Sequence, residues 1–171
     1  MSSSNAVIRA WSQAYASQSY ADWETYHALC LAQGRVAECA WLHLLQMACE
    51  KLCKAHMMKD GRQNFNWRSH KCIAKTLPII VRDIASRTTD RGTKSNVVSH
   101  LLQIARALSP HIESLAPTSD AQTPNAEYPW QDQSGAVVVP AEYDFSEFAP
   151  LRTPRGAQLI KLLQHAAQTL K

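Results

Sequence analysis

The sequence predicts an all-α protein, an antiparallel up-and-down bundle of four to five helices, and three observations support this prediction. Apolar residues recur at steps of three and four along most of the chain, which is the spacing of helices with one buried face. Only five glycines occur among 171 residues, too few for a turn-dense all-β fold. Hydrophobic residues make up 46% and charged residues 19%, enough for a core. We therefore expect residues 1–171 to form a single helical domain.

The first part of the chain predicts helical structure followed by one long helix. Apolar residues between positions 5 and 32 follow helical spacing, with a break expected at Ser19–Tyr20 and a stop at Gly34. Residues 35–59 carry the strongest helical pattern of the sequence. Asp60–Gly61 is a typical helix end, because glycine adopts the backbone conformation that a helix terminus needs.

Three further helices are predicted, and two of them contain a proline. The third helix spans about residues 70–87, and Pro78 is expected to kink it or to reset its start. The fourth spans about residues 94–115 and contains Pro110, where the helix is expected to bend or end. The last helix opens at Pro154 and carries an apolar stripe to the end of the sequence.

Residues 116–153 form a long connection before the last helix. A structureless connection of this length is uncommon inside a compact domain. Its aromatic residues offer a large area for burial, at about 25 cal/mol per Å²; they are Tyr128, Trp130, Tyr143, Phe145 and Phe148. We predict an ordered Tyr-Pro-Trp loop that packs over the bundle as a lid through Tyr128, Trp130 and the Tyr143/Phe145 pair. Strand pairing is expected only around Val137–Val139.

The charge distribution is uneven along the chain. Eleven basic and three acidic residues lie between Lys51 and Lys94, whereas positions 107–151 contain seven acidic residues and no Lys or Arg. A basic stretch of this kind is typical of an anion-binding or nucleic-acid-binding surface. The alternative is that the two segments face each other, within one chain or across a dimer. The predicted RNA- or nucleotide-binding residues are Lys51, Lys54, Arg68, His70, Lys71 and Lys75, although His70 could instead orient the start of the third helix.

One pair of residues suggests catalysis. Arg106 and His111 are separated by four residues, and an Arg with a His can cleave RNA without a metal. His111 would exchange the proton and Arg106 would stabilise charge on the phosphate. Five residues along a regular helix place the two side chains about 140° apart, so a bend at Pro110 would bring them together or separate them. A chance occurrence of this spacing is the alternative.

The cysteines indicate reduced thiols rather than a disulfide framework. There are five of them, an odd number, and most lie within helical patterns, which is usual for a cytoplasmic protein. Cys39/His43 and Cys49/Cys53 have the spacing of a zinc site on one helix face, and small buried hydrophobic residues are the alternative. We expect no metal or other cofactor, because no Cys-x-x-Cys-like knuckle, His-Glu-x-x-His helix or phosphate-binding glycine loop occurs. No secretion signal or membrane-spanning run is apparent.

The segment LLQMACEKLCKAHMMKDG, residues 44–61, resembles the signature helix of HEPN domains, the higher eukaryotes and prokaryotes nucleotide-binding family. The matching positions are Gln46, Ala48, Glu50, Lys51, Lys54 and Ala55. SHKCIAKTLPII is similar to the family's next helix, which opens with a His. NAEYPW resembles the family's Arg-Tyr-Pro loop, with Glu127 at the Arg position. Glu127, Tyr128 and Trp130 are the candidate site residues of this loop, and a packed lid would place its acidic groups near the mouth of the bundle or near a dimer partner.

The resemblance implies a homodimer and two classes of function. Many HEPN proteins are metal-independent endoribonucleases of toxin–antitoxin, CRISPR or phage-defence systems, and two copies of an Arg-x(4–6)-His motif meet at their dimer interface. Others bind nucleotides or a protein partner, often a minimal nucleotidyltransferase. In this chain Arg106 and His111 lie near the end of the penultimate helix, not at the start of the last one. We therefore expect RNA or nucleotide binding, with a non-catalytic assembly module as the alternative.

Overall fold

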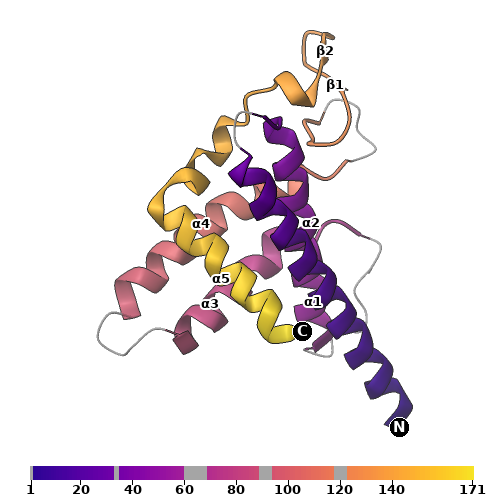
Figure 1. The fold of residues 1–171 in the computed structure, drawn as a ribbon, viewed down its shortest axis with the longest axis vertical. Helices are drawn as coiled ribbons and strands as arrows, with labels where there is room; N and C mark the ends of the chain where they lie inside the picture. The colour runs from indigo at the N-terminus through magenta and orange to yellow at the C-terminus, as the bar shows by residue number, and fades with distance from the viewer. Residues whose placement is uncertain (1, 33–34, 60–68, 89–93, 118–122) are drawn as a thin grey trace.

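The computed structural model describes residues 2–32, 35–59, 69–88, 94–117 and 123–171, and these form an all-α helical bundle (Figure 1). Its α-helices are α1 (Ser2–Leu31), α2 (Glu38–Lys59), α3 (Ile73–Thr88), α4 (Lys94–Ser114) and α5 (Pro154–Leu170). The predicted fold class is confirmed. No helix in the described ranges is long and apolar enough to cross a membrane.

Two helix pairs and one shared helix make up the bundle. Helices α1 and α2 lie antiparallel, since the Ser12 hydroxyl donates to the Ala55 carbonyl (2.8 Å) and the Ser19 hydroxyl to the Ala48 carbonyl (2.7 Å). Helix α3 packs mainly on α4, and α5 packs against all four other helices (Figure 1). Consequently the core draws residues from every helix, with Trp23 and Leu52 among its fully buried side chains.

The break predicted at Ser19–Tyr20 is wrong, because α1 continues without interruption from Ser2 to Leu31. Neither Ser nor Tyr prevents helical backbone geometry, and the Ser19 side chain is fully buried against α2. Its bond to the Ala48 carbonyl makes it a contact between helices instead of a helix end. The ends predicted at Gly34 and Asp60–Gly61 lie outside the described residues, as does Arg68.

Helices α3 and α4 both run through their prolines. Pro78 is the sixth residue of α3, which begins at Ile73, and α4 continues past Pro110 to Ser114. The predicted span of about 94–115 is therefore confirmed, and of the two outcomes expected at Pro110, a bend or an end, the end does not occur. Leu108 and Ile112 lie on either side of this proline and are almost completely buried. We attribute the continuity to this burial, which outweighs the single backbone hydrogen bond that proline removes.

The long connection is ordered where it is described, from Thr123 onwards. It contains the antiparallel strands β1 (Trp130–Gln131) and β2 (Val137–Val138), followed by the 3₁₀ helices η1 (Pro140–Glu142) and η2 (Ser146–Arg152). The Trp130 ring meets Tyr143 edge-on at 5.0 Å between centroids, and Tyr143 meets Phe145 at 4.9 Å. The packed aromatic loop is thus confirmed. Tyr128 is 55% exposed, so its predicted part in this packing is wrong.

Candidate functional site

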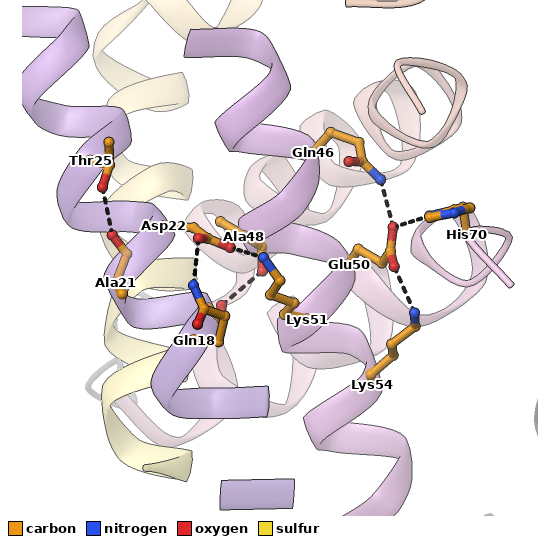
Figure 2. A network of polar contacts seen from close by, with 11 residues as sticks. Gln18, Ala21, Asp22, Thr25, Gln46, Ala48, Glu50, Lys51, Lys54 and His70 are labelled. Atoms are coloured by element: carbon orange, nitrogen blue, oxygen red, sulfur yellow. Dashed lines mark hydrogen bonds and ion pairs between the residues drawn. The ribbon is translucent and has the colours of Figure 1, made fainter. Parts of the chain in front are cut away.

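The site begins with a buried carboxylate on α2. Glu50 is only 5% exposed, and Figure 2 shows three side chains pointing at it. The Lys54 ammonium donates to one carboxylate oxygen at 2.6 Å, and the Gln46 amide donates to the other at 2.7 Å. His70 Nδ1 contacts this second oxygen at 2.7 Å. Gln46, Glu50 and Lys54 lie at successive four-residue steps, so α2 itself aligns three of the four groups.

The hydrogen bonds around Glu50 keep it ionised. Burial by itself raises the pKa of a carboxyl group, but hydrogen bonds from Lys54, His70 and Gln46 outweigh burial and hold the pKa of Glu50 below its ordinary value. An ionised carboxylate can only accept hydrogen bonds. The proton of the His70–Glu50 contact therefore lies on Nδ1 of the imidazole.

The same contact fixes the other side of the His70 ring. With Nδ1 as donor to Glu50, Nε2 is the nitrogen that remains to accept or transfer a proton. The His70 side chain is 53% exposed, although its partner is buried. A carboxylate behind an imidazole is the arrangement that orients a general acid–base in enzymes. His70 is therefore placed for ligand contact or proton transfer.

His70 lines a groove of about 460 Å³ between the start of α3 and the end of α4. The other polar residues that line it are Ser69, Lys71, Glu113, Ser114 and Thr123. The Glu113 carboxylate accepts from the Ala74 backbone amide at 3.0 Å, within the first turn of α3. This contact satisfies an amide that has no partner within the helix, and it ties α4 to the segment that carries His70.

The structure divides the predicted binding residues into two groups. Lys51 bonds to Asp22 of α1 at 2.5 Å, and Lys54 is 6% exposed against Glu50 (Figure 2). These two ammonium groups are neutralised within the bundle, so they are not placed to contact a surface ligand. Lys71 and Lys75 are exposed; Lys71 follows His70 directly in the turn before α3, and Lys75 lies in the first turn of that helix.

Arg106 and His111 are both exposed on α4. Since α4 continues through Pro110, helical spacing of five residues places their side chains about 140° apart around its axis. The His111 ring meets Phe148 of η2 edge-on, with 6.4 Å between ring centroids. Neither residue is among those that line the His70 groove.

The loop residues lie beside α2. Glu127 is 3.9 Å from His43, and its hydrogen bond with the Tyr128 hydroxyl raises the pKa of that phenol. The buried Asn125 holds the turn, because its side-chain oxygen accepts from the backbone amides of Glu127 (3.0 Å) and Tyr128 (2.7 Å). The Glu127–His43 contact and the Glu113 contact with α3 are two points at which the acidic segment, positions 107–151, meets another part of the same chain.

The cysteine pairs have different environments. Cys49 and Cys53 are fully buried in the core, and burial raises the pKa of both thiols, so they pack as small hydrophobic residues. Cys39 is half-buried, and burial raises the pKa of its thiol as well. Among the described residues, no group of three or more His, Cys, Asp or Glu side chains is placed to hold a metal ion.

Sequence reasoning missed Glu50, Glu113 and Asn125 as site residues. For Glu50 a signal existed, because Gln46, Glu50 and Lys54 share one helix face. Glu113 and Asn125 act on residues whose position depends on the tertiary fold or on the local turn, and no sequence pattern singled them out.

Comparison of the chain with protein-family models, with curated proteins and with solved structures found no match in any of the three. The resemblance to HEPN domains therefore stays a hypothesis, based on α2 and the Tyr-Pro loop.

Proposed function

We propose that this protein binds RNA or a nucleotide in the groove at His70, with the imidazole Nε2 as its central polar contact. One observation carries the proposal: a half-exposed histidine, oriented by a buried carboxylate, lines a groove of about 460 Å³. A solvated surface histidine does not require a buried charge behind it. The three donors that keep Glu50 ionised maintain this arrangement at neutral pH.

The charges around the groove suggest how the ligand lies. Lys71 is exposed, follows His70 directly and lines the groove, so it would attract phosphate. Glu113 lies across the groove, where its negative charge disfavours phosphate and its oxygens accept from hydroxyl or amino groups. In the proposed orientation, phosphate lies toward Lys71 and the ribose or base toward Glu113.

With the ligand in this orientation, metal-independent RNA cleavage is the reaction to test. Nε2 of His70 would take the proton of a 2′-hydroxyl as the 2′-oxygen attacks phosphorus, and the 5′-oxygen would leave with a proton from water. The Lys71 ammonium would stabilise the charge that develops on the phosphate oxygens. Arg106 and His111 are the competing catalytic pair, and they lie outside this groove.

The test combines binding and cleavage of a labelled RNA in EDTA by wild type, His70→Gln and His111→Ala. Glutamine retains a donor toward Glu50 but lacks the imidazole. We expect affinity to fall steeply as salt rises, and His70→Gln to weaken binding about tenfold and to abolish any cleavage. His111→Ala should behave as wild type. Loss of cleavage in His111→Ala alone would move the catalytic role to the Arg106–His111 pair.

A second candidate function is a non-catalytic assembly module, and the first half of α1 favours it. Val7 is 56% exposed and Trp11 is 53% exposed, four residues apart on one helix face. Large apolar side chains at this spacing are typical of a surface that another helix covers. An absence of RNA binding, together with a dimer mass in light scattering, would support this candidate over the first.

A further inference from the structure

A second cavity, of about 270 Å³, lies where the final turns of three helices meet. Its lining residues come from the end of α2, the second half of α3 and the end of α5, and none of them lines the His70 groove. Four apolar side chains form part of its wall: Ile80, Ile84, Ala166 and Leu170. A ligand that enters it would therefore gain contact with aliphatic carbon.

The remaining lining residues of this cavity are polar, and two of them, Lys59 and Arg87, are cations. Lys59, Arg87 and His165 are exposed residues of three different helices, and all three line the cavity. Asp83 is the one acidic residue among the lining residues, and its carboxylate accepts from Arg82 at 3.1 and 3.2 Å. Its charge is thus compensated by a cation outside the cavity, so Lys59 and Arg87 leave the cavity positively charged.

The preference of helix C-termini for basic residues does not by itself account for cations around an apolar cavity. Basic residues are favourable at helix C-termini, where the last carbonyl groups carry partial negative charge. That effect explains the basic residues in the last turns of α2 and α3, but it does not require Lys59 and Arg87 to lie around an apolar cavity. Apolar walls with cations at the rim match a molecule that has a hydrocarbon body and an anionic head.

We propose that this cavity binds a small amphipathic anion, with the hydrocarbon body against Ile80 and Leu170 and the carboxylate or phosphate head at Lys59 and Arg87. The volume lies just below the range of drug-sized ligand pockets, so the ligand is a small molecule. The proposal is independent of RNA or nucleotide binding at His70, because the two sites share no residue.

The probes are octanoate and octyl phosphate, titrated into the full chain at pH 7 and followed by amide NMR shifts. The uncharged 1-octanol and inorganic phosphate each carry one half of the proposed ligand. We expect saturable shifts in the second half of α3 and the last turns of α5 with both amphipathic anions. Comparing their affinities shows which head group the site prefers. Octanol alone and inorganic phosphate alone should each bind at least about tenfold more weakly than the amphipathic anions.

Two variants and one control complete the test. Arg87→Gln removes a cation from the rim and should weaken octanoate binding about tenfold, whereas Arg155→Gln, an exposed change at the opposite end of α5, should leave it unchanged. Thr169→Trp fills the cavity from its exposed rim and should abolish binding, with circular dichroism confirming that the variant folds. Equal binding of octanol and octanoate, or unchanged affinity in Arg87→Gln, would overturn the proposal.

Discussion

At the scale of single residues, Glu50 determines the chemistry of the site and also a part of its stability. Its carboxylate is buried, and removing a charge from water is costly unless partners compensate for the lost hydration. Lys54, Gln46 and His70 provide that compensation over contacts of 2.6 to 2.7 Å. A change of Glu50 therefore leaves the Lys54 ammonium buried without its counter-charge, which is more damaging than the loss of one hydrogen bond.

We predict that Glu50→Gln lowers the free energy of unfolding by about 3 kcal/mol at pH 7 and flattens its dependence on acid. The folded-state pKa of Glu50 is lowered, so its contribution is present above the ordinary glutamate value of about 4.3 and is lost as pH falls through the folded pKa. Urea unfolding at pH 7, 5, 4 and 3 measures both effects. The exposed Glu24→Gln is the matched control, and parallel curves for wild type and Glu50→Gln would contradict the prediction.

The sequence allowed only part of this network to be predicted. Gln46, Glu50 and Lys54 are neighbours by helix geometry alone, so their alignment follows from the predicted helix. His70 lies 20 residues beyond Glu50, and Asp22 lies 29 residues before Lys51. Contacts over such separations depend on how the chain turns back, which the local pattern does not encode. For this reason the sequence does not distinguish Lys51 and Lys54, which are paired within the bundle, from the exposed lysines.

At the scale of elements, helix ends were predictable where the signal is local. Thr153 caps α5, since its hydroxyl accepts from the Gly156 amide at 3.1 Å, and Pro154 occupies the first helical position. The break expected at Ser19 failed because the serine bonds to a different helix. Local polarity indicates a possible helix end, but a tertiary partner decides whether the helix continues.

Gly156, in the first turn of α5, is constrained by a tertiary contact with η2. A Cβ at this position would meet the backbone of η2, at the Pro150 carbonyl and at the Leu151 Cα (2.6 Å). Alanine normally stabilises a helix over glycine by about 1 kcal/mol. Here we expect Gly156→Ala to destabilise the protein by about 1 to 3 kcal/mol, because η2 has to move away from α5.

Thermal and urea unfolding measure this change, with the exposed neighbour Ala157→Gly as control. The control should lose about 1 kcal/mol, the ordinary cost of glycine within a helix. A stabilised Gly156→Ala would mean that α5 and η2 separate easily, and the close contact between them would then contribute little to the fold.

At the scale of the whole molecule, the long connection belongs to the hydrophobic core. Trp130, Phe145 and Phe148 are buried together with residues of the helices. The Ala126 amide also donates to the Leu115 carbonyl at the end of α4 (3.1 Å). Aromatic content predicted that the loop packs, because the burial of large rings stabilises even irregular backbone. Which rings are buried depends on the direction in which each side chain points. Composition does not contain this direction, so the exposure of Tyr128 could not be predicted from it.

The last prediction tests whether the loop folds with the bundle as one unit. Phe148→Ala should lower the free energy of unfolding by about 3 to 5 kcal/mol, since the ring is fully buried in η2 and packs between His111 of α4 and Phe145. Tyr128→Ala is the aromatic control and should change stability by less than about 0.5 kcal/mol, because Tyr128 is mostly exposed. Hydrogen exchange adds the decisive measurement. If the loop and α4 open together, Phe148→Ala accelerates exchange in both. Faster exchange in the loop alone, with α4 unchanged, would show that the lid is a separate layer on an independently stable bundle.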